Sequence, residues 1–299
     1  MFWFGIVCLN KFFFGDLVDG VSEFMGKSIL ITGCSSGIGF CVAKGLKDRG
    51  YQTLATCRRD EDVERLKELG FDSFKLDLAD SSSIKKAVAQ TIQKTGGRLF
   101  ALFNNGAYGM AGAVEDLSRD AIREQFEVNL FGTMELTNLL IPVMRKHFEG
   151  RIIQNSSVLG LVSLPYRGAY NASKFALEGL TDAMRLELSD SGIYVSLIES
   201  GPILSNFRKN VYKAFNRHID PSKSVHAEIY KTLEHRLTRE GAIQKGTLPP
   251  EAVLKKVIHA LESDSPKIRY YVTIHTHIAA ILKRALPFGM LDWVIKREG

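Results

Sequence analysis

The chain has 299 residues, of which 45% are hydrophobic and 24% are charged, and its mean hydropathy is −0.02. This composition is typical of a water-soluble globular protein and excludes a disordered or fibrous chain. The chain has no charge-free run of about 20 residues that would predict a membrane span. The formal net charge is +6, but residues 204–247 alone carry +5, and no zinc-finger spacing or RNA-binding aromatic motif accompanies them, so a nucleic-acid partner is not expected.

The N-terminal segment differs from the rest of the chain. It opens with Met-Phe-Trp-Phe-Gly-Ile-Val-Cys-Leu and lacks the positive start and the small-residue cleavage site of a secretory signal. Three interpretations remain open: an interfacial aromatic anchor over residues 1–14, a packing arm, or residues that precede the natural start at Met25. We favour the last, which makes residues 1–24 an extension and residues 25–299 a single domain.

From residue 28 onward, short apolar runs alternate with helical patterns. We predict strands at 28–32, 51–57, 73–78, 99–104, 151–156, 194–199 and 270–274, and helices ending near 49 and over 63–69, 81–95, 120–144 and 170–189. Apolar runs alternating with helices predict an α/β fold, a doubly wound, seven-stranded parallel sheet with helices on both faces. Residues 204–262 interrupt this pattern with basic helical segments, which we interpret as a substrate lid.

Neither the cysteines nor the histidines predict a metal site. The four cysteines form no Cys-x-x-Cys pair and favour a reducing compartment, hence the cytoplasm: Cys8, Cys34, Cys41 and Cys57. His275 and His277 alternate, which would put them on one face of a strand, and a metal site there is the less favoured alternative to ordinary surface or packing.

A glycine-rich turn follows the first predicted strand and reads Thr32-Gly33-Cys34-Ser35-Ser36-Gly37-Ile38-Gly39. Gly33 permits a tight turn, Gly37 lets the backbone approach a pyrophosphate, and Gly39 lets the new helix pack closely on the strand. The N-terminus of that helix offers free N–H groups to an anion. Between a strand and a helix, this spacing predicts a dinucleotide site.

The end of the second predicted strand indicates which dinucleotide binds. An NAD site places an Asp or Glu at this corner for the ribose 2′-hydroxyl, whereas this chain has Thr56-Cys57-Arg58-Arg59. Arg58 is suitably placed for a 2′-phosphate, and such a charge-assisted contact contributes about 1.5–3 kcal/mol, roughly a 10- to 150-fold preference. The cofactor is therefore predicted to be NADP(H).

A tyrosine and a lysine four residues apart, Tyr170 and Lys174, share one face of a predicted helix. A phenol with a pKa near 10 is a poor acid–base catalyst alone, and we expect the nearby ammonium to lower that pKa. Ser157 ends the fifth predicted strand and could orient a substrate carbonyl toward the phenol. Together these residues predict proton transfer to or from a carbonyl oxygen.

In this order of motifs the chain resembles the short-chain dehydrogenase/reductase family, whose Rossmann fold binds a nicotinamide cofactor. The resemblance covers residues 27–261 and rests on the glycine turn, Asp77, Asn104-Asn105, Asn129, Ser157, Tyr170 and Lys174. Within the family the chain is similar to bacterial NADP-dependent aldehyde reductases and, more distantly, to 17β-hydroxysteroid and retinol dehydrogenases.

The resemblance implies roles for further residues. Asp77 and Leu78 would flank the adenine, Asn105 would support the sheet near the cofactor, and Asn129 would bind a water that extends a proton relay to Lys174. Lys174 would also hold the nicotinamide ribose. The predicted cofactor site comprises Gly33, Ser35, Ser36, Gly37, Ile38, Gly39, Arg58, Asp77, Leu78, Asn105, Gly106, Tyr170, Lys174, Pro202 and Ile203.

These observations predict an NADP-dependent oxidoreductase that reduces medium- or long-chain or other apolar aldehydes, or ketones, to alcohols through Ser157, Tyr170 and Lys174. A steroid, retinol or hydroxyacyl dehydrogenase is the alternative within the family, and an NADPH-sensing binding protein is the alternative outside enzymes. The family resemblance implies a homodimer or homotetramer. Weak contact with a membrane surface, through residues 1–14 and an amphipathic tail at 278–295, is a third alternative.

Overall fold

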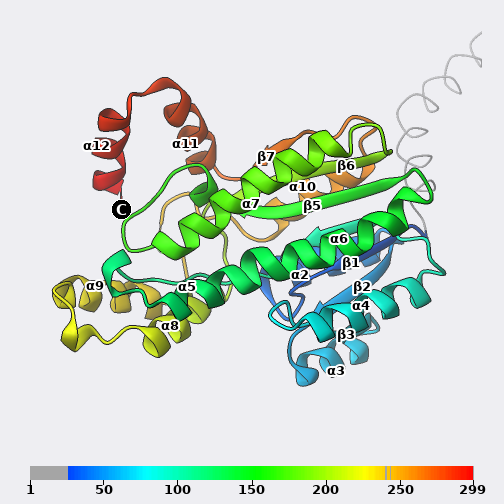
Figure 1. Cartoon of the computed structure of the whole chain (residues 1–299), viewed down its shortest axis with the longest axis horizontal. Helices are drawn as coiled ribbons and strands as arrows, with labels where there is room; N and C mark the ends of the chain where they lie inside the picture. Colours follow the sequence, from blue (N-terminus) through cyan, green and yellow to red (C-terminus); the bar gives the residue numbers. More distant parts are fainter. Residues whose placement is uncertain (1–25, 240, 243, 299) are drawn as a thin grey trace, which may run out of the picture.

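The computed structural model describes residues 26–239, 241–242 and 244–298. Within them, seven parallel strands form one sheet in the order β3-β2-β1-β4-β5-β6-β7 (Figure 1). The strands are β1 (Ser28–Ile31), β2 (Gln52–Cys57), β3 (Asp72–Lys75), β4 (Ala101–Asn104), β5 (Gly150–Ser157), β6 (Ile193–Ser200) and β7 (Arg269–Tyr271). The strand order reverses between β1 and β4, so the predicted doubly wound sheet is confirmed.

Helices cover both faces of this sheet. They are α2 (Gly37–Asp48), α3 (Asp60–Glu68), α4 (Ser81–Lys94), α5 (Arg119–Phe126), α6 (Gly132–Arg145), α7 (Gly168–Glu187), α8 (Phe207–His218), α9 (Ala227–Thr238), α10 (Glu251–Glu262), α11 (Ile274–Ala285) and α12 (Phe288–Glu298). Short turns of 3₁₀-helix lie at η1 (Val114–Asp116), η3 (Val158–Gly160) and η4 (Pro221–Lys223). The predicted extension at 1–24, the start at Met25 and Cys8 lie outside the described residues.

The strands alternate their side chains between two apolar layers. Ile29 and Ile31 of β1 pack with α2, α3 and α10, whereas Leu30 packs on the opposite face with α4, α6 and α7. All three side chains are fully buried. This alternation follows from the two-residue period of a strand, and burial on both faces explains why the strands are continuous apolar runs in the sequence.

The helix predicted over 120–144 is interrupted by a π-helical segment, η2 (Glu127–Phe131), between α5 and α6. The path of the chain remains helical, and Pro142 lies within α6. A single π-helical turn changes the rotation of the side chains that follow it, which hydrophobic periodicity does not resolve. The segment matters because Asn129 lies in its centre.

The prediction for the last strand was wrong at its C-terminal end. β7 ends at Tyr271, and residues 274–285 form α11, so His275 and His277 lie on a helix rather than on one face of a strand. In a helix of 3.6 residues per turn, residues two apart point in different directions. The ring of His277 packs against Tyr271, with 5.3 Å between ring centroids.

The segment 204–262, predicted to be a lid, divides into two parts with different partners. α8 and α9 share an apolar cluster of their own, which includes Val211, Phe215 and Tyr230. Figure 1 shows these two helices together at one end of the molecule. α10 instead packs in the sheet core through Val253 and Val257. The predicted lid boundary is therefore corrected to exclude α10, whose apolar stripe completes the layer over β5 and β6.

Three further observations apply to the described residues alone. No helix among them is both long and apolar enough to span a bilayer. No group of three or more His, Cys, Asp or Glu side chains in this part of the chain is arranged to hold a metal ion. The cysteines Cys34, Cys41 and Cys57 are free.

Candidate active site

The turn between β1 and α2 is shaped by its glycines. Gly33 and Gly37 have φ angles of +72° and +57°, which L side chains rarely adopt. A Cβ atom on Gly39 would overlap the carbonyl oxygen of Gly33 and would lie 2.6 Å from the side-chain nitrogen of Asn105. Because no side chain fits at this position, α2 can pack closely on the strand and begin at Gly37 with free backbone N–H groups.

A cavity of about 540 Å³ lies at the carboxyl ends of β1, β4, β5 and β6, where a doubly wound sheet binds its ligand. The glycine turn contributes part of the wall, and the loop after β6 and the helices α8 and α9 contribute the rest. The predicted site residues that line the cavity are Gly33, Ser35, Ser36, Gly37, Ile38, Asn105, Gly106, Ser157, Tyr170, Lys174, Pro202 and Ile203.

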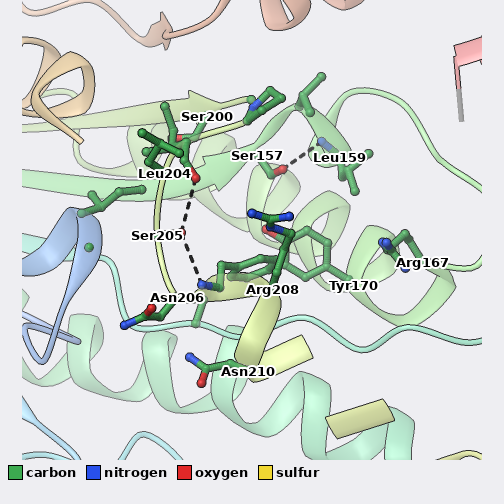
Figure 2. Close-up of a pocket in the computed structure, with 18 of the residues that line it drawn as sticks. Ser157, Leu159, Arg167, Tyr170, Ser200, Leu204, Ser205, Asn206, Arg208 and Asn210 are labelled. Carbon is green, nitrogen blue, oxygen red and sulfur yellow. Dashed lines mark hydrogen bonds between the residues drawn. The ribbon is translucent and has the colours of Figure 1, made fainter. Parts of the chain in front are cut away.

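Ser157, Tyr170 and Lys174 meet at this wall. Tyr170 and Lys174 lie one turn apart on α7, and Ser157 is the last residue of β5. The Ser157 hydroxyl accepts from the backbone N–H of Leu159 at 3.1 Å (Figure 2), and it is near enough to the phenol of Tyr170 to act on its pKa. The Lys174 ammonium lies 5.8 Å from the centroid of the Tyr170 ring. The structure thus brings the three predicted residues together.

Burial controls the protonation of this pair. It raises the pKa of Tyr170 to about 12, and the interaction with the Ser157 hydroxyl lowers this pKa by a smaller amount. Burial also lowers the pKa of Lys174 to about 8, and the nearby Glu178 carboxylate opposes this shift. The expectation that Lys174 lowers the pKa of Tyr170 was therefore wrong, because burial raises this pKa and Lys174 does not contribute to its shift. At neutral pH the phenol keeps its proton.

A hydrogen-bonded chain connects Lys174 to the glycine turn. The Lys174 ammonium donates to the backbone oxygen of Asn155 at 2.7 Å. The Asn155 side chain donates to Asn105 at 3.0 Å, and Asn105 in turn donates to the backbone oxygen of Thr32 at 2.9 Å. Sequence reasoning missed Asn155, although it shares a strand face with Ser157 two residues later. Its hydrogen bonds connect Lys174 to the predicted phosphate turn.

Asn129 is buried in the π-helical segment and does not line the cavity. Its side-chain nitrogen donates to the backbone oxygen of Tyr108 at 2.9 Å and to the hydroxyl of Ser173 at 3.2 Å, while its oxygen accepts from the N–H of Tyr108 at 3.1 Å. The amide thus bridges the loop after β4 to α7. Its role in a proton relay stays a prediction.

Three residues predicted for the adenine side of the cofactor lie outside the cavity wall: Arg58, Asp77 and Leu78. Arg58 directly follows β2 and is exposed, whereas the neighbouring Arg59 is held by Asp62 at 2.8 Å. Asp77 accepts from the backbone N–H of Ala79 at 3.0 Å. Arg58 is thus the free cation at this corner among the described residues.

Leu78 packs behind the cavity wall, and Pro202 and Ile203 lie at the edge of the cavity. Leu78 is buried and packs at Gly106, where an added Cβ would lie 3.1 Å from the leucine methyl. The backbone oxygen of Pro202 accepts from the N–H of Leu248 at 3.1 Å, and Ile203 pairs with Leu248 in an isolated bridge. This pairing fixes the loop after β6 against the cavity.

The far wall of the cavity combines apolar and cationic side chains. Apolar residues of η3, its flanking loop, α8 and α9 face the cavity: Val158, Leu159, Leu164, Phe207, Ile229, Leu233 and Leu237. Phe207 packs on the ring of Tyr170, with 5.5 Å between centroids. The arginines Arg167, Arg208 and Arg236 also line the cavity. Only Arg167 had a usable sequence signal, since it lies one helical turn before Tyr170.

Comparison with known proteins agrees with this architecture. Residues 27–215 match the family model described as short chain dehydrogenase. The oxidoreductase YbbO of Escherichia coli (strain K12) is 44% identical over 91% of this chain and 95% of its own length. Human 17-beta-hydroxysteroid dehydrogenase type 1 is 33% identical over 82% of this chain and 77% of its own. A Burkholderia phymatum short chain dehydrogenase/reductase solved in complex with NAD is 21% identical to this chain and has a TM-score of 0.74. The match covers 91% of this chain and 96% of the Burkholderia chain.

Proposed function

We propose that this chain, which belongs to the short-chain dehydrogenase/reductase family, is an NADP(H)-dependent reductase of apolar aldehydes or ketones. The observation that carries the proposal is the convergence of Ser157, Tyr170 and Lys174 on one cavity beneath the glycine turn. Steroids, retinoids and hydroxyacyl compounds are the alternative substrates of the same site. We also expect a homodimer or homotetramer, as the family resemblance implies.

The residues present fit a nicotinamide dinucleotide. The space that a Cβ atom on Gly39 would fill is needed for close packing of α2, and this packing directs the free N–H groups of Gly37 and its neighbours to a pyrophosphate. Lys174 would hold the nicotinamide ribose. When bound, NADPH supplies a hydride to the substrate carbonyl carbon.

The chain's own residues supply the proton and orient the carbonyl. Tyr170, with a pKa of about 12, remains protonated at neutral pH and can donate its proton to the carbonyl oxygen as the carbon is reduced. Ser157 can donate a hydrogen bond to the same oxygen. The Lys174 ammonium would stabilise the phenolate that remains after donation, and its pKa of about 8 keeps it charged at pH 7.

NADP(H) rather than NAD(H) is proposed because of the charge at the end of β2. The residue that follows the strand is the exposed Arg58, and no carboxylate occupies the position that would hold a ribose 2′-hydroxyl. A guanidinium at this corner is complementary to a 2′-phosphate.

The apolar substrate class is proposed from the cavity wall. Phe207 and Leu233 of the lid helices and Leu159 of η3 face the same space as Tyr170. A cavity of about 540 Å³ falls in the usual range for small-molecule sites.

The proposal is tested by NADPH oxidation on a panel of aldehydes and ketones, with Tyr170→Phe as the variant. We expect turnover to fall by about 10²- to 10⁴-fold, the usual contribution of a positioned acid. NADPH binding, followed by cofactor fluorescence, should persist. Tyr194→Phe is the matched control, because Tyr194 is 45% exposed on β6 and lies outside the cavity. Equal turnover in Tyr170→Phe would refute the mechanism. NADPH binding without turnover of any carbonyl would support the sensing alternative.

A further inference from the structure

The polar part of the cavity wall has one sign of charge. Four of its described lining residues are cationic, and none of these lining residues is Asp or Glu: the cations are Arg167, Lys174, Arg208 and Arg236. Lys174 belongs to the proposed chemistry. Arg208 already donates to backbone oxygens within the chain, so Arg167 is the candidate for binding a ligand.

Arg167 is the arginine closest in sequence to the reacting groups. It is the N-cap residue of α7, three positions before Tyr170, and both residues line the cavity. In the view of Figure 2, Arg167 and Arg208 lie on either side of the Tyr170 ring. An anion bound by Arg167 would therefore lie within the same cavity as a carbonyl at Tyr170.

The guanidinium of Arg167 has little compensation from the protein. Its one hydrogen bond among the described residues goes to the neutral backbone oxygen of Tyr166 at 3.1 Å, and no described carboxylate pairs with it. Burial, reinforced by repulsion from Arg236, lowers its pKa to about 10. A guanidinium has five N–H donors in a planar fork that matches a carboxylate, so most of its donors are available to a ligand.

The backbone around Arg167 is strained, which is a separate observation. Tyr166 has a φ angle of +58°, a conformation that is unfavourable for a bulky residue, and its carbonyl oxygen accepts from Gly112 at 3.1 Å. The Tyr166 ring is fixed against His226 and Tyr230, with centroids 5.4 and 6.4 Å away. Strain of this kind persists where the surrounding structure enforces a particular side-chain position. The backbone oxygen of this strained residue also accepts the hydrogen bond from the Arg167 guanidinium.

We propose that the substrate is an apolar carbonyl compound that carries an oxyanion, such as a carboxylate, and that Arg167 binds this oxyanion. This proposal rests on the proposed reductase activity and specifies its substrate. The apolar wall formed by Phe207 and Leu233 would take the hydrocarbon part. Arg208 is less suited to this role, because it already donates to the backbone oxygens of Arg236 and Gly241 and also lines the basic hollow near Gly37.

The test compares ω-oxo carboxylates of increasing chain length with their methyl esters, which have nearly the same shape and no charge. We expect the wild-type chain to reduce the acid of best length with a kcat/KM about 10- to 100-fold above that of its ester. Arg167→Gln should lower this ratio to near one, and Arg167→Lys should restore part of it. Arg98→Gln is the control: Arg98 is exposed before β4, at the opposite end of the sheet, so this variant loses the same net charge and should keep the ratio.

The wild-type comparison does not depend on the folding of any variant. Esters reduced as well as acids at every length, or an unchanged ratio in a folded Arg167→Gln, would overturn the proposal. A calorimetric titration with the corresponding ω-hydroxy acids and their methyl esters tests the anion site separately from the reductase activity. Binding of the acid that depends on Arg167, in a chain that reduces no carbonyl, would refute the activity and retain the anion site; equal binding of acid and ester would refute the site.

Discussion

The buried ammonium of Lys174 should make the chain less stable at neutral pH than a chain without it. Its pKa falls from 10.5 to about 8 on folding, because the side chain is fully removed from water. This lowering costs the folded state about 3 kcal/mol, at about 1.36 kcal/mol for each pKa unit. Lys174→Met removes the charge but also the hydrogen bond to Asn155, which contributes about 1 kcal/mol. We therefore expect Lys174→Met to unfold with a free energy about 2 kcal/mol above wild type at pH 7.

The pH dependence provides the sharper measurement. Below pH 8 the lysine is protonated in both the folded and unfolded chains, so the full penalty applies. Between about pH 8 and 10.5 the folded chain loses its proton while the unfolded chain keeps it, so the unfolded state binds more protons and wild-type stability rises. The advantage of Lys174→Met should therefore shrink across this interval.

Urea unfolding of both chains from pH 6 to 10, followed by circular dichroism, measures this difference. Lys85→Met on the exposed face of α4 is the control and should show no such interval. A Lys174→Met chain that is less stable than wild type at pH 7, or a difference that stays constant from pH 7 to 10, would refute the reasoning. Reductase activity should be lost in Lys174→Met whatever the stability result.

Two other substitutions test the corner after β2 and a buried ion-pair cluster. Arg58→Asp should lower the ratio of kcat/KM for NADPH over NADH by about 10- to 150-fold, since it replaces a 2′-phosphate contact with repulsion; an unchanged ratio would contradict the assignment of NADP(H). Arg269→Met should lower the free energy of unfolding by about 3–5 kcal/mol, because Arg269 pairs with the buried Glu178 at 3.0 Å and with Asp182 at 2.7 Å. Urea unfolding beside Arg98→Met, an exposed control, measures this loss, and a loss equal to that of the control would be the contrary result.

The parts of the site that depend on local sequence could be predicted, and those that depend on distant packing could not. The glycine turn could be predicted because only glycine readily adopts the φ angles at positions 33 and 37, and because a Cβ atom does not fit at position 39. Tyr170 and Lys174 are readable because helical spacing places them on one face. Their pKa values were not readable, because burial by residues from several elements sets them.

The errors in the fold have the same origin. The strand predicted to continue to Ile274 ends at Tyr271, and the helix that follows is recognised only from the spacing of Ile274, Ile278 and Ile281 over a longer window. α10 was assigned to the lid because it follows the basic segment in the chain. Its place in the core depends on contacts with α2, which is more than 200 residues earlier in the sequence. Hydrophobic periodicity predicts that a segment is helical, but not which other elements the helix packs against.

The chemistry and the specificity of the proposed site come from different parts of the fold. Lys174, Asn155 and Asn105 form one hydrogen-bonded chain from the catalytic ammonium to the turn, all within the sheet and α7. Because each member holds the next, displacement of the turn should change the position of the ammonium, and cofactor binding and proton transfer should be coupled. Arg208 and the apolar residues Phe207, Leu233 and Leu237 of the wall belong instead to α8 and α9, which have a separate apolar cluster. Arg167 is the exception, since it precedes the catalytic helix itself, and a substrate anion bound there would be placed relative to Tyr170 by the same backbone that places the phenol.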